Sequence, residues 1–144
     1  MELQCNSRMK AESKLRGNGE LILVVEDNPN LRELLASVLE AFNYRVLTAF
    51  TAELALELWQ KRTERIPVVL ADFMLPTTNG LVLATELQKQ EPELKVIFTS
   101  GELGMDAIKN SIPRNWAFLE KPFSHIAILK KLKQALDPEF HLVA

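Results

Sequence analysis

Five short apolar runs alternate along the chain with longer segments in which apolar residues recur three and four positions apart. The runs at 21–25 and 68–72 are rich in Val, Leu and Ile and are too short for helices, which is typical of buried strands. The longer segments have the spacing of amphipathic helices. This pattern predicts strands at 21–25, 45–49, 68–72, 95–99 and 116–119, and helices at about 29–42, 52–59, 80–90, 103–111 and 125–136.

The alternation of strands and helices predicts an α/β fold. Consecutive βαβ units build a parallel sheet with helices on both faces, and their crossovers are right-handed. For five strands the common doubly wound order is 2-1-3-4-5, which gives a flavodoxin-like (βα)5 sandwich. In that order the first and third strands are neighbours, and ligands bind beyond the carboxyl ends of the strands at this point.

The third predicted strand, 68–72, ends on the carboxylate of Asp72. Pro76 prevents the strand from continuing, and the turn-forming residues 77–80 lead into the next helix. Asp72 is therefore expected at the open edge of the sheet and not in the core. The first strand ends on Glu26 and Asp27, which the predicted strand order places beside Asp72.

A chain of 144 residues fits one domain with a single core. Residues 1–19 are polar and of mixed charge and end in Gly17-Asn18-Gly19, so we expect a flexible lead-in or linker there. The domain is expected to span 20–138, with a short tail at 139–144. No output domain is expected to follow it.

Composition and charge exclude several classes of partner. The net charge is −2, and no basic block forms the surface that a nucleic-acid-binding protein needs. The longest apolar runs are about the length of 21–25, far short of the roughly 20 residues that span a bilayer. The amino terminus has no apolar signal core, so we expect a cytoplasmic protein without membrane contact. Cys5 is the single cysteine and cannot form a disulfide within the chain.

The acidic residues expected at the sheet edge would repel one another unless a cation neutralised them. Mg²⁺ suits such a group because it binds a few carboxylates, keeps several waters and leaves room for phosphate oxygens. Lys121 follows the fifth strand, and Ser100 follows the fourth strand with a hydroxyl. Together these groups predict a phosphoryl site in which Asp72 is the nucleophile and forms an aspartyl phosphate.

Each of these residues alone has a commoner structural explanation. A carboxylate after a strand usually caps a loop, adjacent acids often stabilise a helix N-terminus, and a Ser-Gly pair is usually a turn. The combination supports the functional interpretation, because all of these residues end separate strands at the one edge of the sheet where ligands bind.

Four segments carry a resemblance to a known family. They are VVEDN at 24–28, DFMLP at 72–76 with Gly80 following, TSG at 99–101 and KPF at 121–123. In order and spacing they resemble the receiver domain of two-component response regulators, over about residues 20–138. The resemblance implies a phosphoacceptor signalling module and not an enzyme. Its phosphoryl donor would be the phosphohistidine of a histidine kinase or of a histidine phosphotransfer protein.

The resemblance gives the acidic residues separate roles. Asp72 would be the phosphoacceptor. Asp27, Asp72 and the backbone carbonyl of Met74 would bind Mg²⁺ directly, whereas Glu26 would act through a water molecule. Glu26 stands where Asp is commoner in the family, a change that many members tolerate.

Residues from the other strands complete the implied site. Ser100 and Lys121 would contact the phosphoryl oxygens, and the peptide bond before Pro122 is expected to be cis. Phe118 falls on the family's aromatic switch position and would turn inward as Ser100 moves towards the phosphoryl group. The surface at 103–136 would then change shape and be recognised by a downstream protein. We expect the domain to be monomeric or weakly dimeric.

The stretch from Gly17 to Val25 looks like the junction between a histidine kinase catalytic domain and an attached receiver. We therefore favour a receiver segment of a hybrid histidine kinase over a stand-alone regulator. Two other functions stay as alternatives. A phosphatase or dehalogenase also uses an Asp at a strand end, but such proteins carry a second Asp at the position of Met74 and a cap domain. A flavodoxin-like cofactor binder needs a phosphate-binding loop where Glu26 and Asp27 would repel phosphate.

Overall fold

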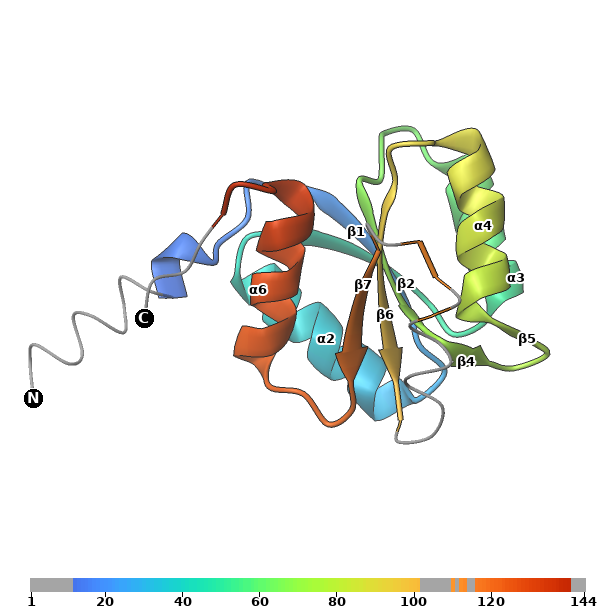
Figure 1. Ribbon diagram of the computed structural model, residues 1–144, viewed down its shortest axis with the longest axis horizontal. Helices are drawn as coiled ribbons and strands as arrows, with labels where there is room; N and C mark the ends of the chain where they lie inside the picture. The colour runs from blue at the N-terminus through green and yellow to red at the C-terminus, as the bar shows by residue number, and fades with distance from the viewer. Residues whose placement is uncertain (1–11, 102–109, 111, 114–115, 141–144) are drawn as a thin grey trace, which may run out of the picture.

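The computed structural model describes residues 12–101, 110, 112–113 and 116–140. Its centre is a sheet of five parallel strands in the order β2-β1-β3-β6-β7 (Figure 1). This order confirms the predicted 2-1-3-4-5 arrangement. The strands are β1 (Leu21–Val25), β2 (Arg45–Ala49), β3 (Val68–Asp72), β6 (Lys95–Ser100) and β7 (Ala117–Glu120).

Helices cover both faces of the sheet. The described helices pack in pairs that belong to separate apolar clusters on the two faces. The first face carries α2 (Pro29–Ala41) and α6 (His125–Leu136), and the second carries α3 (Ala52–Lys61) and α4 (Gly80–Gln90). The helix predicted at 103–111 lies mostly outside the described residues.

A side-chain oxygen caps the start of each of these four helices. Asn28 accepts two backbone N–H groups of α2 at 3.0 and 3.1 Å. Thr51, Asn79 and Ser124 each accept the N–H three residues further along, at 3.1, 2.9 and 3.1 Å. Such caps satisfy donors that the helix itself leaves unpaired. Because each helix begins beyond the carboxyl end of a strand, the caps also fix the loops at that edge of the sheet.

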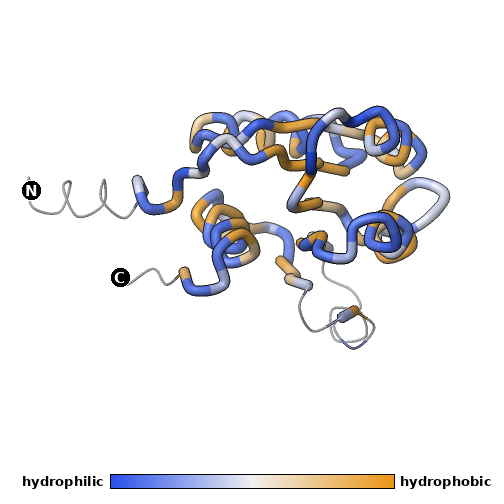
Figure 2. Tube along the Cα trace, turned by 90° about the horizontal axis from the view of Figure 1, so that it is seen from above, coloured by the Kyte–Doolittle hydropathy of each residue, from blue (hydrophilic) through white to orange (hydrophobic). Residues whose placement is uncertain are grey.

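Apolar side chains fill the space on both faces of the sheet. In β1, Leu21, Leu23 and Val25 contact the core on the α3 and α4 side, whereas Ile22 and Val24 contact the core on the α2 and α6 side. Successive side chains of a strand point to opposite faces, so a strand covered on both faces is apolar throughout. Figure 2 shows apolar residues along the strands and an alternation of apolar and polar residues along the helices.

A short hairpin follows β3 and is not predicted by the sequence pattern. β4 (Met74–Leu75) and β5 (Thr78–Asn79) pair in antiparallel fashion. Thr77 in the turn has a φ of 67°, in the left-handed region that β-branched residues rarely adopt. Its hydroxyl donates to Glu53 Oε1 at 3.0 Å, which ties the turn to α3.

The described end of the lead-in, residues 12–19, packs on the domain. Leu15 is buried in the same apolar cluster as Tyr44, and the Gly17 N–H donates to the carbonyl of Phe42 at 2.7 Å. A Cβ on Gly17 would overlap the ring of Tyr44. This part of the expected flexible lead-in is therefore docked, because Leu15 supplies an apolar anchor. Packing begins before the boundary that the sequence suggests at residue 20.

None of the helices in the described ranges has the length and apolar character needed to cross a membrane.

Candidate functional site

Three carboxylates from two neighbouring strands meet at the carboxyl edge of the sheet. β1 and β3 pair in parallel with Val25 opposite Ala71, so Glu26 and Asp72, which follow, also lie side by side. Asp27 comes one residue later. One carboxylate oxygen of each acid lies within 4.8 Å of the other two. The structure thus brings together the acids that the strand ends predict to be close.

The three acids differ in exposure. Glu26 and Asp72 are 1% and 7% exposed, whereas Asp27 is exposed. A buried charge is costly unless it is paired. In the part of the chain that the structure describes, no hydrogen bond or ion pair engages the carboxylate of Asp27. Asp27 is therefore the acid most available to an added cation.

Lys121 forms ion pairs with both buried carboxylates. Its Nζ lies 2.9 Å from Glu26 Oε1 and 2.9 Å from Asp72 Oδ2. The Lys121–Pro122 peptide bond is cis. Lys121 follows β7, and β6 separates β7 from β3, so the side chain reaches across the end of β6. The Lys121 N–H donates to the carbonyl of Ser100 at 2.7 Å, which holds the start of this loop beside β6.

Burial and pairing both act on the charged groups. Burial raises the pKa of Glu26 above its usual range, and the nearby negative charge of Asp72 raises it further. Hydrogen bonds from Lys121 and from the Asn28 N–H, the latter at 3.1 Å, lower this pKa and so oppose the rise. Burial alone would lower the pKa of Lys121, but its bonds to Asp72 and Glu26 together raise it. Lys121 is therefore a cation at neutral pH.

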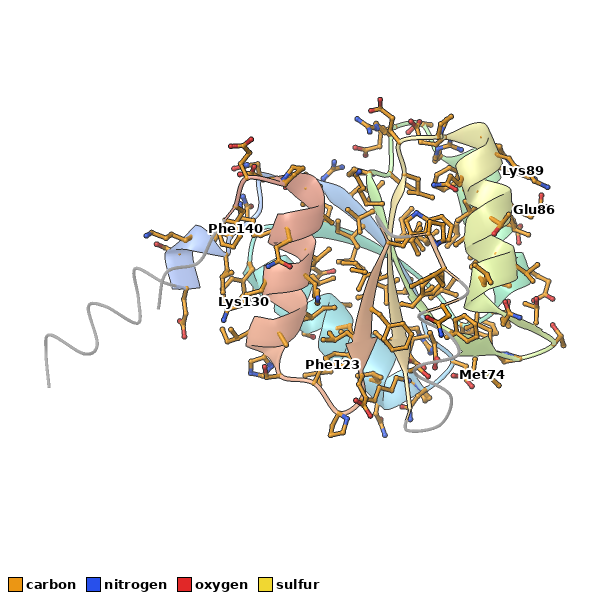
Figure 3. The ribbon with its side chains drawn as sticks, in the orientation of Figure 1. Met74, Glu86, Lys89, Phe123, Lys130 and Phe140 are labelled. Atoms are coloured by element: carbon orange, nitrogen blue, oxygen red, sulfur yellow. The ribbon has the colours of Figure 1, made fainter. Side chains whose placement is uncertain are left out.

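The backbone around Asp72 is tightly folded. Asp72 Oδ1 accepts the N–H of Met74 at 3.0 Å, and the Gly80 N–H donates to the carbonyl of Phe73 at 2.7 Å. A Cβ on Gly80 would lie 2.6 Å from the carbonyl oxygen of Asp72. Glycine is therefore required for this close approach. The side chain of Met74 is exposed at the start of the hairpin (Figure 3).

Ser100 and Phe118 project from the same face of the sheet. Ser100 is the last residue of β6 and is 2% exposed, whereas Phe118 on β7 is half-buried. Phe118 pairs with Phe98, two residues before Ser100, so Phe118 and Ser100 are diagonal neighbours on one face. Phe118 packs against the apolar cluster that contains Phe98. The neighbouring positions suit the expected switch, which stays a prediction.

Arg32 is a residue of this region that the sequence pattern does not reveal. From α2, its Nη1 donates to the carbonyl of Glu26 at 2.9 Å and to that of Asp27 at 3.4 Å. Its guanidinium carbon lies 5.7 Å from the ring centre of Phe50. An arginine near the start of an amphipathic helix is ordinary. Only the folded chain shows that this side chain turns back onto the acidic loop.

An apolar groove of about 520 Å³ borders the ion pair. Leu34 in this groove is 51% exposed, and Figure 3 shows Phe123 in the loop between β7 and α6. Exposed apolar surface of this kind often marks an interaction site. The groove is lined by Leu31, Leu34, Gly101, Lys121, Pro122 and Phe123.

A larger groove of about 710 Å³ lies at the opposite edge of the sheet. Charged residues of both signs line it, including Arg45, Glu64 and Lys95, and none of the three clustered acids is among its lining residues. Size alone therefore does not locate the chemical site.

A family model described as the response regulator receiver domain matches residues 22–133. The match includes the three clustered acids, Ser100 and Lys121. The chain belongs to the receiver domain family of response regulators. Receiver domains are signalling modules of two-component systems, and the hydrolase and cofactor-binding alternatives are not favoured.

Relatives of this receiver domain include parts of longer proteins. The sensor kinase CckA of Brucella abortus is 31% identical over 120 residues, which make up 82% of this chain and 13% of CckA. The C4-dicarboxylate transport transcriptional regulatory protein DctD of Pseudomonas aeruginosa is 30% identical over 121 residues, or 81% of this chain and 25% of DctD. The chain thus spans a small part of each, and both a kinase and a transcriptional regulator contain the shared domain.

Solved structures agree with the receiver fold. NtrX from Brucella abortus, in complex with ADP, is 31% identical and superposes with a TM-score of 0.75 over 84% of this chain and 28% of that chain. A CheY-like receiver domain protein from Methanospirillum hungatei is 27% identical, with a TM-score of 0.75 over 84% of this chain and 96% of that chain.

Proposed function

We propose that this receiver domain accepts a phosphoryl group on Asp72 from a phosphohistidine, in a reaction that requires Mg²⁺, and changes its surface in response. Membership of the receiver family supports the proposal. The observation that carries it is the acidic cluster, in which Asp72 lies within 4.8 Å of Glu26 and Asp27 and is paired with Lys121 at 2.9 Å.

Asp72 is the acid best placed to act as nucleophile. It lies one strand from Ser100, because β3 pairs with β6, whereas Glu26 is more deeply buried. An Asp72 carboxylate oxygen would bond to phosphorus while the bond from phosphorus to the donor's imidazole nitrogen breaks. The nitrogen keeps the electron pair, and a proton on the other ring nitrogen lets the imidazole leave as a neutral ring. The products are an aspartyl phosphate and an unmodified histidine. Lys121 and the Ser100 hydroxyl would donate hydrogen bonds to the phosphoryl oxygens.

The donor set fits Mg²⁺. Three hard carboxylate groups lie together, and the carboxylate of Asp27 is exposed. We assign Asp27, Asp72 and the backbone carbonyl of Met74 as direct ligands, and Glu26 as a ligand through water. A bound Mg²⁺ would offset the negative charge of the acids and of the phosphoryl oxygens.

A protein donor has to bring its imidazole to Asp72 and therefore contacts the surface around it. The apolar groove between Leu34 and Phe123 lies directly beside Lys121 and would contact that donor. We propose a histidine kinase or a histidine phosphotransfer protein as the donor, and a downstream protein that recognises the surface at 103–136. The domain would act in the cytoplasm, as a monomer or weak dimer, either alone or as the receiver segment of a hybrid histidine kinase.

Phosphorylation followed by intact-mass measurement tests the assignment. With Mg²⁺ and acetyl phosphate, the wild type should gain one phosphoryl group that hydroxylamine removes, as expected for an acyl phosphate. Asp72→Asn should gain none, because an amide is not a comparable nucleophile. Asp137→Asn is the control, since Asp137 caps the far end of α6. Undiminished labelling of Asp72→Asn would overturn the proposal.

A further inference from the structure

An arginine holds the loop that carries the acidic pair. Glu26 and Asp27 lie between β1 and α2, so their side chains reach the site only while the loop keeps its bend. Arg32 Nη1 donates to the carbonyl of Glu26 at 2.9 Å and to that of Asp27 at 3.4 Å. Guanidinium keeps its charge and has no acceptor, so it is well suited to hold carbonyl oxygens.

Phe50 connects this arginine to the neighbouring strand. The Arg32 guanidinium carbon is 5.7 Å from the ring centre, within the range of a cation–π contact. Phe50 follows β2, and the carbonyl of Ala49 in β2 accepts the Glu26 N–H at 3.0 Å. Arg32 therefore joins α2, the acidic loop and the end of β2.

The two acids of the loop depend on the backbone to different degrees. The Glu26 carboxylate is held by Lys121 and by the Asn28 N–H. The Asp27 carboxylate has no such partner among the residues that the structure describes. Its position relative to Asp72 is set by the loop backbone, whose carbonyls at Glu26 and Asp27 accept hydrogen bonds from Arg32.

We propose that Arg32 is a positioning residue for the magnesium site. It fixes the peptide groups of Glu26 and Asp27, so that the free carboxylate of Asp27 is held near Asp72 before Mg²⁺ arrives. This inference rests on the proposed function, because it requires the acidic cluster to bind Mg²⁺. Arg32 acts through the loop and is not assigned a contact with the metal or the phosphoryl group.

Positioning and charge have opposite effects on metal affinity. If Arg32 acted only as a nearby positive charge, its removal would strengthen the binding of a divalent cation. If it positions the loop, its removal weakens binding, as does the loss of other residues that support metal ligands. Arg32→Gln removes the charge and the contacts. Arg32→Lys keeps the charge but lacks the planar guanidinium that contacts both the loop carbonyls and the Phe50 ring.

Arg62 provides a matched control at the opposite edge of the sheet. Its Nη1 donates to the carbonyl of Trp59 at 2.6 Å, and its guanidinium carbon lies 3.9 Å from the Trp59 ring. Arg62 caps the carboxyl end of α3, away from the acids. Arg62→Gln therefore removes the same charge and the same kinds of contact without touching the acidic loop.

The test is a titration of thermal melting with Mg²⁺ alone. A ligand that binds the native state raises Tm according to its affinity and concentration. The apparent Kd for Mg²⁺ should rise about tenfold or more in Arg32→Gln, by less in Arg32→Lys, and stay unchanged in Arg62→Gln. The metal-free Tm of each variant measures separately what the lost contacts do to the fold.

Unchanged or tighter Mg²⁺ binding in Arg32→Gln, with normal binding in the wild type, would overturn this inference alone. Absence of a Mg²⁺ effect in the wild type would instead overturn the proposed magnesium site. If Arg32→Gln did not fold, Phe50→Leu would replace it, since this change removes the ring and keeps the arginine. Phe50→Leu should weaken Mg²⁺ binding by a smaller factor, and unchanged binding would count against the inference.

Discussion

Replacing Lys121 by Met would leave two buried carboxylates without their cation. Glu26 and Asp72 are 1% and 7% exposed, and each has an ion pair of 2.9 Å with Lys121. Methionine keeps an unbranched apolar chain but donates no hydrogen bond. The donors that remain within the described residues are the backbone N–H groups of Asn28 and Met74. The variant therefore buries negative charge that is not neutralised.

The burial of the ion pairs sets the size of the expected loss in the free energy of unfolding. Removing one partner of a buried ion pair costs about 3–5 kcal/mol. The Lys121 side chain is 25% exposed, so water reaches the site and we expect the lower end of that range, about 3 kcal/mol at neutral pH. Burial already raises the pKa of Glu26, and the loss of Lys121 removes a bond that opposes the rise.

The loss of stability in Lys121→Met should depend on pH, and the raised pKa of the buried carboxyl group gives the direction. A carboxyl group whose pKa is raised by folding stabilises the fold fully below its unfolded pKa, and that contribution disappears as the pH rises through the folded pKa. The deficit of Lys121→Met should therefore shrink as the pH falls towards about 4, the ordinary range of carboxyl groups.

Urea denaturation without divalent metal measures the effect. If the free energy of unfolding falls by about 2 kcal/mol per molar urea, a loss of about 3 kcal/mol in stability lowers the urea midpoint by roughly 1.5 M. Lys89→Met is the control, because Lys89 pairs with Glu86 at 3.0 Å with both side chains more than half exposed, and its loss should cost about 0.5 kcal/mol or less. Adding Glu26→Gln to Lys121→Met should restore part of the stability.

A midpoint for Lys121→Met as close to the wild type as that of Lys89→Met would show that Lys121 does not stabilise the buried carboxylates. A deficit that responds neither to pH nor to Glu26→Gln would do the same, because it would show that the loss does not come from buried carboxylate charge.

Three further predictions concern other parts of the fold. Tyr44→Phe should stabilise the domain by about 1 kcal/mol, because no described residue pairs with the buried hydroxyl. Burial also raises the pKa of Tyr44, so wild-type stability should fall above pH ~10, where the unfolded tyrosine ionises, and the variant's advantage in urea titrations should widen there. Gly80→Ala should destabilise the domain by about 1–3 kcal/mol and slow its phosphorylation, because a Cβ at this position meets the backbone of Asp72. Gly101→Ala is the control and should keep the wild-type urea midpoint, because a Cβ there meets nothing within 4 Å. Beryllofluoride, a phosphoryl mimic, should turn the Phe118 ring inward and shift its aromatic NMR signals, and identical ring signals in both states would contradict the switch.

The strands and the acidic edge could be predicted because they depend on local sequence. A strand covered on both faces, such as β3, has to be apolar along its length, so the polar Asp72 marks its end. Right-handed crossovers then leave few strand orders, and the common one places β1 beside β3. The proximity of Glu26 and Asp27 to Asp72 follows from this order.

Contacts made by isolated or long side chains could not be predicted in the same way. Leu15 is one apolar residue in a polar stretch and forms no periodic pattern, yet it anchors the lead-in. Thr77 occupies a turn position with positive φ, where Gly or Asn is the usual signal, so residues 77–80 predicted a turn but not the hairpin. The reach of Lys121 to Glu26, and of Arg32 to the acidic loop, depends on side-chain conformations that sequence spacing does not determine.

Reductive trapping of the phosphorylated protein identifies the phosphorylated residue directly. Borohydride reduces an acyl phosphate to an alcohol, so a phosphorylated aspartate becomes homoserine and can be located by peptide mass spectrometry. We predict that the modification falls on Asp72 alone, and only when a phosphoryl donor and Mg²⁺ are both present. Trapping at Asp27 or Glu26 would show that Asp72 is not the phosphoacceptor, and phosphorylation that continues without divalent metal would show that the reaction does not require Mg²⁺.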